Sequence, residues 1–480
     1  MITKRCRKNF ALILALMMLA GCGEAAVPAD TTAAGTTAAP VETEDPALIP
    51  DLEVRDFGGA EFCTATFENV NFHYNTIAEE ENGDTLNDAI FKRNQTVEDT
   101  YNVRMTQFLY PDSGDGRASI KSSVLAGDDA YNVIVLRPDM ALSWWTEGLL
   151  ISMDEIPNIN LDKKYWDKSI NDSLSIGGSQ YIAEGAFNLD GYDLTFCLVF
   201  NQELAKTANI PNLYETVSSG KWTIDLMEQY MKTVANDVNG DTVMDDQDVW
   251  GYTAHPKMVA PGFWIGAGVT TIAKDKDDVP YISMKEQRFV DVFERVFQLA
   301  HDSGATYMTE GDKSDIPGEI RAIFAEDRSL FMDMSFAFIE SLRAMDTDFG
   351  IIPYPKYEES QDSYHARVCY YMPSVVPITC KDTDFTGYML EVLNAESYKT
   401  VIPAYYEVAL KGKYSRDAES AEMLDLIFES RVIDIGDSTL CGTIRDGFIF
   451  RMMRDNSRDL ASEVASNEAI INDKLSVMTK

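Results

Sequence analysis

The segment 237–248, with the sequence DVNGDTVMDDQD, follows the twelve-residue pattern of a calcium-binding loop. Such a loop offers hard oxygen ligands at positions 1, 3, 5, 7, 9 and 12, and position 7 contributes its backbone carbonyl. The residues at these positions are Asp237, Asn239, Asp241, Val243, Asp245 and Asp248. Thr242 replaces the glycine expected at the sharp turn, and Asp248 is shorter than the usual glutamate. The pattern predicts a structural Ca²⁺ site, and a solvated acidic loop is the alternative.

Sequence motifs of common enzymes are missing from the chain. The histidines His73, His255, His301 and His365 lack the HExxH spacing of zinc hydrolases, and neither a nucleophile elbow nor a glycine-rich phosphate loop occurs. Paired carboxylates could hydrolyse glycosides, but 78 acidic residues form such pairs by chance. We therefore assign no catalytic residue.

The elements that must position these groups alternate between strand and helix patterns from residue 51 onward. The continuous apolar run 131–136 is typical of a strand covered on both faces. Asp84 or Thr85 is predicted to cap one helix and Thr223 another. Further strands are predicted at 62–67, 103–108 and 196–200, and further helices at 285–301, 385–395, 398–409 and 418–429. This rhythm predicts an α/β fold with largely parallel sheets.

The N-terminal sequence has the pattern of a bacterial lipoprotein signal peptide. Four basic residues between Lys4 and Lys8 precede the apolar run 10–20, and small Ala20 and Gly21 stand before Cys22. Cleavage would make Cys22 the first residue, carrying a diacylglycerol and further acyl chains such as palmitate, which anchor a protein stably. Residues 1–21 are then the signal peptide and 22–50 a lipidated flexible linker. An uncleaved short anchor or an ordinary secretory signal is the alternative.

Charge and cysteine content limit the partners. The formal net charge is −37, and loss of four basic residues with the signal makes it more negative. Such a chain repels nucleic acid and anionic membrane surfaces. Of seven cysteines, five remain after Cys6 leaves and Cys22 is lipidated, and none forms a CxxC pair. Buried free thiols are predicted, and Cys369 with Cys380 is the first disulfide to test.

Short stretches along nearly the whole mature chain resemble those of one family, in the family's order. They are DFGG at 56–59, GDTLNDA at 83–89, GLL at 148–150, NQEL at 201–204, GKWT at 220–223, FGIIPYP at 349–355, AESY at 395–398 and PAYY at 403–406. With them the chain resembles the extracellular solute-binding proteins of ABC importers, in the sugar-type, maltose-binding-protein-like branch. Members of this branch occur as lipoproteins on the outer face of the cytoplasmic membrane.

The resemblance implies an α/β fold of the two-lobed periplasmic-binding-protein type II, with hinge strands between the lobes. Lobe 1 is predicted to comprise 51–186 with 370–400, and lobe 2 to comprise 187–369 with 401–480. A monomeric receptor would capture a mono- or oligosaccharide in the interlobe cleft and deliver it to the permease subunits. Only bound solute makes closure of the two lobes favourable.

Within that family, ligand contacts are expected at strand ends and crossovers, because open α/β sheets bind ligands there and flat rings cover the apolar face of a sugar. The candidates are Glu80, Arg137, Asp139, Trp144, Trp145, Asn188, Asp190, Tyr192, Asp193, Trp264 and Tyr371, with Tyr370 as an alternative to Tyr371. Each candidate could instead serve packing or the solvated surface. Adjacent tryptophans on a helix point in different directions, so at most one of Trp144 and Trp145 would face the ligand.

Three other functions stay open at this point. A surface enzyme acting on polysaccharide is the main alternative, and a sensory or adhesive carbohydrate-binding module is another. The acidic loop also resembles half of a dockerin repeat, but the second copy that a dockerin needs is missing from the sequence.

Overall fold

The computed structural model describes residues 46–68, 76–111, 113–309, 318–342, 344–369, 371–410 and 418–479. The predicted signal peptide, Cys22, nearly all of the linker and Tyr370 lie outside the described residues. Within those ranges no helix combines the length and the hydropathy that crossing a membrane requires.

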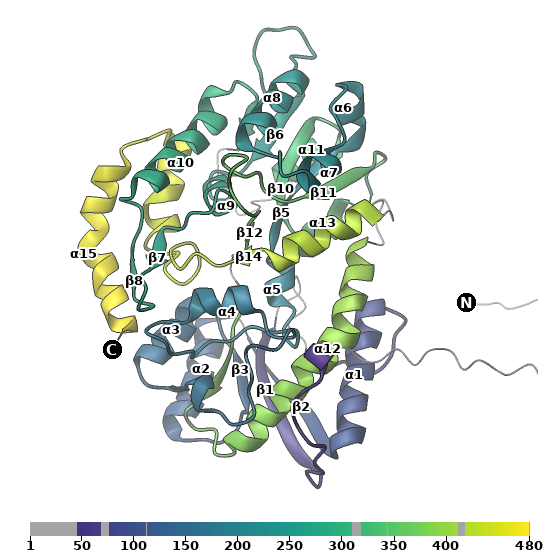
Figure 1. Cartoon of the computed structure of the whole chain (residues 1–480), viewed down its shortest axis with the longest axis vertical. Coiled ribbons are helices and arrows are strands. Elements are labelled where there is room, and N and C mark those ends of the chain that lie inside the picture. Colours follow the sequence, from purple (N-terminus) through teal and green to yellow (C-terminus); the bar gives the residue numbers. More distant parts are fainter. Residues whose placement is uncertain are drawn as a thin grey trace, which may run out of the picture. The chain divides into compact units, whose positions relative to one another are not determined.

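The first sheet has five strands in the order β2-β1-β3-β13-β4. Figure 1 shows β3, β1 and β2 of this sheet side by side. They are β1 (Ala60–Glu68), β2 (Val103–Pro111), β3 (Val133–Val135), β4 (Leu150–Ile151) and β13 (Ser374–Pro377). β1 pairs in parallel with both β2 and β3, whereas β13 runs antiparallel to β3 and β4. The helices between its strands are α1 (Thr85–Tyr101), α2 (Gly114–Ala126) and α3 (Pro138–Thr146).

The second sheet also has five strands, in the order β11-β5-β10-β6-β9. They are β5 (Phe196–Asn201), β6 (Trp250–Ala254), β9 (Thr306–Met308), β10 (Ser329–Ser335) and β11 (Phe349–Ile352). β6 runs parallel to β9 and β10, whereas β5 is antiparallel to β10 and β11. Helices that accompany it are α6 (Gln202–Thr207), α7 (Leu213–Ser218), α8 (Ile224–Val234), α9 (Val259–Gly266), α10 (Gln287–Phe297) and α11 (Gly318–Ala325).

In each sheet one strand runs in the direction opposite to the other four. That strand comes directly after the chain has crossed from one sheet to the other. β5 comes after segment 186–195, which contains the short helix α5 (Asp190–Asp193), and β13 comes after segment 366–373. The predicted α/β fold with two largely parallel sheets is therefore confirmed, and it is the two-lobed type II architecture. The exact boundaries between the lobes stay a prediction.

Further α-helices and strands lie outside the two sheets. They are α4 (Lys168–Leu174), the hairpin β7 (Ile272–Lys274) with β8 (Pro280–Ile282), the pair β12 (Ala366–Arg367) with β14 (Arg431–Val432), α12 (Thr383–Leu410), α13 (Ala418–Glu429), α14 (Phe450–Asp455) and α15 (Leu460–Met478). α12 packs along α1 and its end lies beside α13 (Figure 1). The C-terminal helix α15 packs against α3 and β8.

Local caps explain why several helices begin where predicted. The Asp84 side chain accepts hydrogen bonds from the amides of Leu86 and Asn87, which settles the choice between Asp84 and Thr85. Thr223 caps α8 through the Leu226 amide. Trp222 and Met227, one on each side of this cap, are both fully buried in the same hydrophobic cluster, the arrangement of a hydrophobic staple.

The two helices predicted at 385–395 and 398–409 are one continuous helix, α12. The segment between them has no helix breaker, and Ser397 is buried where its hydroxyl accepts a hydrogen bond from Arg93 (Nη1 to Oγ, 3.0 Å). Packing against α1 therefore outweighs the weak local preference of the polar residues at this point.

Residues 49–55, which span the end of the predicted linker, lie against the part of the protein that contains the first sheet. Lys163 donates to the carbonyl of Ile49 (3.0 Å) and Tyr388 donates to the carbonyl of Glu53 (2.7 Å). Arg55 also pairs with Asp384 at the start of α12 (2.7 Å).

Candidate ligand-binding site

The carboxyl end of β3 presents the first part of the candidate site. Leu136, the first residue after β3, is buried. Arg137 follows it as the residue before α3, and Pro138 is the first residue of that helix. A proline is favoured at this position because the first helical amide has no intrahelical acceptor. Arg137 and Asp139 form a loose ion pair (Nε to Oδ1, 3.4 Å) and remain partly exposed, so both stay available to a ligand.

The corresponding end of β6 presents the second part. His255, Pro256 and Lys257 follow the strand directly and lead into α9. The His255 ring accepts a hydrogen bond from the Lys257 amide (N to Nδ1, 3.1 Å), which holds this turn. The sequence reasoning missed these residues, although the rule that led to Arg137 applies equally to the end of β6.

A C-terminal segment, residues 434–446, joins both strand ends. Lys257 forms an ion pair with Asp446 (Nζ to Oδ1, 3.0 Å). Burial raises the pKa of the Cys441 thiol, Arg445 opposes this, and the carboxylates of Asp446 and Asp139 raise it further. Asp139 of the first sheet and Lys257 of the second are thus both close to this segment. We call Arg137, Asp139, His255, Lys257, Cys441 and Asp446 the cleft residues, after the interlobe cleft that the resemblance implies.

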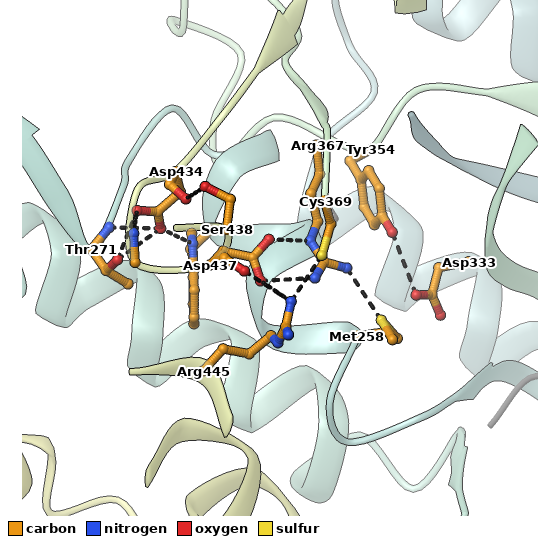
Figure 2. Close-up of polar contacts among 12 residues, drawn as sticks. Met258, Thr271, Asp333, Tyr354, Arg367, Cys369, Asp434, Asp437, Ser438 and Arg445 are labelled. Atoms are coloured by element: carbon orange, nitrogen blue, oxygen red, sulfur yellow. Dashed lines mark hydrogen bonds and ion pairs between the residues drawn. The ribbon is translucent and has the colours of Figure 1, made fainter. Parts of the chain in front are cut away.

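A buried ionic network fixes the C-terminal segment in place (Figure 2). Arg367 binds Asp437 through two hydrogen bonds, Nε to Oδ2 at 2.6 Å and Nη2 to Oδ1 at 2.8 Å. Arg445 reaches the same carboxylate (Nη1 to Oδ1, 3.2 Å) and also the Asp437 carbonyl (2.8 Å). Burial would raise the pKa of Asp437, but the two guanidinium groups lower it below its usual value. The carboxylate therefore stays charged between two arginines.

The predicted contact Trp264 is only 1% exposed and lies in the core beside the second sheet. Its indole Nε1 donates to Asp434 (3.1 Å), which also accepts from the Thr271 amide (2.9 Å) and the Thr271 hydroxyl (2.7 Å). Figure 2 shows Asp434 and Thr271 on the side of the network away from Arg367. The structure thus gives Trp264 a packing contact that holds the C-terminal segment, and does not bring it to the cleft residues.

The crossover residues Asn188, Asp190 and Asp193 are all buried. Asn188 donates to the Met372 carbonyl (2.6 Å), which ties the two crossovers together. Asp193 accepts a hydrogen bond from Tyr405 of α12 (2.8 Å). Neither carboxyl oxygen of Asp190 has a hydrogen-bond partner among the described residues, and burial raises the pKa of this group well above the usual value. The three residues thus lie together within the buried crossover.

The remaining candidates are dispersed. Trp144 is 1% exposed in the first-sheet core, whereas Trp145 is half-buried and stacks on Tyr181 with ring centroids 4.8 Å apart. Tyr371 is fully buried, and Glu80 is exposed ahead of α1. Tyr192 lies under the guanidinium of Arg431, 4.0 Å from the ring centroid. The expectation that the two tryptophans point differently agrees with these positions.

The predicted calcium loop folds on itself through its carboxylates. Asp237 accepts hydrogen bonds from the Gly240 and Thr242 amides (2.6 and 2.8 Å), and buried Asp248 accepts from Val238 and Asp245. Thr242 has a φ of 70°, the left-handed conformation that glycine adopts at this position of the pattern. Among the described residues, no group of three or more His, Cys, Asp or Glu side chains is arranged to hold a metal. Calcium binding stays a prediction.

All five cysteines of the described residues are free thiols. Cys197, Cys369 and Cys380 are buried, whereas Cys63 and Cys441 are partly exposed. Cys369 and Cys380, the pair singled out for testing, are not joined.

No family model and no curated protein matches the sequence. Solved structures do match, over most of the chain. The ABC substrate-binding protein Lmo0181 from Listeria monocytogenes, in complex with cycloalternan, is 13% identical with a TM-score of 0.56, covering 87% of this chain and 99% of that one. UspC of M. tuberculosis is 13% identical with a TM-score of 0.59, covering 86% and 100%. The GacH receptor of Streptomyces glaucescens, solved without ligand and with acarbose, is 16% identical with a TM-score of 0.53, covering 86% and 98%.

These likenesses define the class of fold. The chain has the architecture of the sugar-type, family 1 extracellular solute-binding proteins of ABC importers, as the sequence stretches indicated. The matched structures are binding proteins rather than enzymes.

Proposed function

We propose that this protein is a lipid-anchored extracellular receptor that captures a carbohydrate between its two lobes and delivers it to an ABC permease. One observation carries the proposal: α3, which follows β3, and the turn after β6 lie beside the same C-terminal segment. Leu142 and Trp145 of α3 line one small cavity with Ile435 and Thr439, and Lys257 pairs with Asp446. In open α/β sheets the carboxyl ends of such strands are where ligands bind.

The cleft residues suit a hydroxylated ligand. Arg137 and Lys257 donate hydrogen bonds, and Asp139 and Asp446 accept them. His255 is 2% exposed and supports the turn that carries Lys257. The strongly negative chain gives no long-range attraction to an acidic solute, which favours a neutral one. Since each sheet supplies part of the site, a sugar that touches both parts stabilises the closed arrangement and is held by it.

Anchoring and delivery rest on the N-terminal sequence. A diacylated Cys22 would keep the receptor at the outer face of the cytoplasmic membrane, and the linker up to residue 50 would let it reach a permease nearby. Uptake of a labelled sugar into cells, compared with cells carrying Cys22→Ser, tests this part. Unchanged uptake by the unanchored variant would refute the need for the anchor.

The central experiment is a sugar panel with the purified lipoprotein in detergent. A cognate sugar at 100 times its dissociation constant should raise the free energy of unfolding by about 2.7 kcal/mol. It should also slow alkylation of Cys441 at least fivefold while leaving Cys63, which is partly exposed on β1, unchanged. Release of shortened sugars would instead identify an enzyme.

A matched pair of variants locates the site. Asp139 lies exposed in the first turn of α3, and Asp115 lies exposed in the first turn of α2. Asp139→Ala should weaken sugar binding about tenfold and Asp115→Ala should not change it. Equal affinities for the two variants would remove Asp139 from the site.

A further inference from the structure

A cavity of about 580 Å³ lies apart from the cleft residues, none of which lines it. Its walls come from α4 and the residues just before it, the end of α12, the end of α13, and the chain near Glu184 and Tyr192. Pockets of this volume hold small organic molecules.

The cavity lies between the two hydrophobic cores. Trp166 on one wall packs with the residues of the first sheet, whereas Phe428 on another packs with those of the second. A molecule in the cavity would therefore touch both parts of the protein.

An acidic and a basic side chain in the walls are both buried and have hydrogen-bonding atoms to spare. Glu184 is 2% exposed, and apart from the neighbouring Gly191 amide its carboxyl oxygens have no hydrogen-bond partner among the described residues. Arg431 is 4% exposed, and its Nη1 has none in that part of the chain. Buried polar atoms in native proteins are nearly always paired, so these atoms need a partner, either water or a ligand in the cavity.

The rest of the Arg431 side chain is already committed. Its Nη2 pairs with Asp167, its Nε donates to the Phe428 carbonyl (3.0 Å), and its guanidinium lies 4.0 Å from the Tyr192 ring centroid. Asp167 neutralises its charge, so a further carboxylate would meet an anion beside it. The position of Nη1 is thus fixed in advance and suited to a neutral acceptor.

The group that serves both Glu184 and Arg431 is a hydroxyl, because it donates and accepts at once. An organic cation would leave Nη1 unsatisfied, and an anion would meet the carboxylate of Asp167 beside Arg431. The rings of Tyr398, Tyr406 and Phe428 supply flat apolar walls of the kind that cover a sugar ring. Burial also raises the pKa of Glu184 well above its usual value, which disfavours an ammonium group as its partner.

We propose that this cavity is a second binding site, separate from the cleft, for a small neutral polyhydroxylated ligand, either a monosaccharide or a polyol. Its hydroxyls bridge the carboxylate of Glu184 and Nη1 of Arg431, and its apolar face lies on the aromatic walls.

The experiment is hydrogen–deuterium exchange of the full lipoprotein with monosaccharides, with polyols such as sorbitol, and with α-amino acids. A sugar or polyol should slow deuterium exchange in segments 164–172 and 425–431. The class of compound that slows exchange there identifies the ligand as a monosaccharide or a polyol. Absence of protection there with every sugar and polyol, or protection by amino acids alone, would overturn the proposal. Alkylation of Cys441 in the same samples reports the cleft, so failure at one site is distinguishable from failure at the other.

A pair of variants adds a second measurement. Glu184→Leu removes both carboxyl oxygens at a similar side-chain volume and should weaken the ligand that protects 425–431 about tenfold, without altering protection of Cys441. Glu155→Leu makes the same change at an exposed site and should alter neither. Unaltered affinity of Glu184→Leu, with the fold intact by circular dichroism, would contradict the role of Glu184.

Discussion

Lys257 and Asp446 form a half-buried ion pair, with Nζ and Oδ1 3.0 Å apart. The pair connects the turn after β6 to the C-terminal segment, far away along the chain. Together Arg445 and Lys257 hold the pKa of Asp446 below its usual value, against the effect of burial. The second half of the proposed cleft thus depends on this contact.

Replacing Lys257 by methionine tests that dependence. The variant loses the ion pair but keeps the aliphatic stem, so we expect sugar affinity to fall about tenfold with little change in stability. Isothermal titration calorimetry measures the loss. Lys206→Met removes a comparable lysine from an exposed pair with Glu203 and serves as the control. Equal affinities of both variants would contradict the assignment of Lys257.

Trp264→Ala should mainly destabilise the fold. Removing a fully buried indole leaves a cavity and typically lowers the free energy of unfolding by about 3–5 kcal/mol. Trp264→Phe keeps most of the packing and loses only the hydrogen bond to Asp434, so its loss should be markedly smaller. Urea unfolding measures both. A Trp264→Ala protein as stable as the wild type would show that the ring does not lie in the core.

Stability should depend on pH through Asp333. Burial raises the pKa of this aspartate to about 6, although Tyr252 donates a hydrogen bond to it (2.9 Å). The folded state then binds the proton more tightly than the unfolded state, whose usual pKa is 3.8. Its contribution is therefore complete below pH 4 and is lost as the pH rises to about 6.

The Asp333→Asn variant isolates that contribution. Relative to the wild type, its free energy of unfolding should rise by up to about 3 kcal/mol between pH 4 and pH 7. Denaturant unfolding at several pH values measures the difference. Asp99→Asn changes an exposed aspartate and should show no such trend. A constant difference between Asp333→Asn and the wild type would contradict the assigned pKa.

Calcium removal tests the loop 237–248. If Ca²⁺ binds there, a chelator should lower the melting temperature and added Ca²⁺ should restore it. Thr242→Gly relieves the left-handed backbone and should stabilise the protein by about 1 kcal/mol in either case. A melting temperature indifferent to both chelator and Ca²⁺ would identify a solvated acidic loop instead.

Local features were predictable because they depend on neighbouring residues. The caps Asp84 and Thr223 and the buried strand after Tyr131 needed no knowledge of distant contacts. The run 259–267 is apolar on all sides, a pattern that indicates burial of Trp264 and was overlooked. The approach of Asp139 to Cys441, and the position of both Glu184 and Arg431 in the walls of one cavity, arise only when distant segments fold together.

The contacts of Ile49, Glu53 and Arg55 fix the N-terminal segment to the part of the protein that contains the first sheet. In the proposed anchored state, the lipid and linker are therefore attached to the part that holds Asp139. The part that holds Lys257 has no direct attachment to the anchor. Ligand capture would then move only the part that holds Lys257 relative to the membrane. A permease could recognise the ligand-bound state from the position of that part.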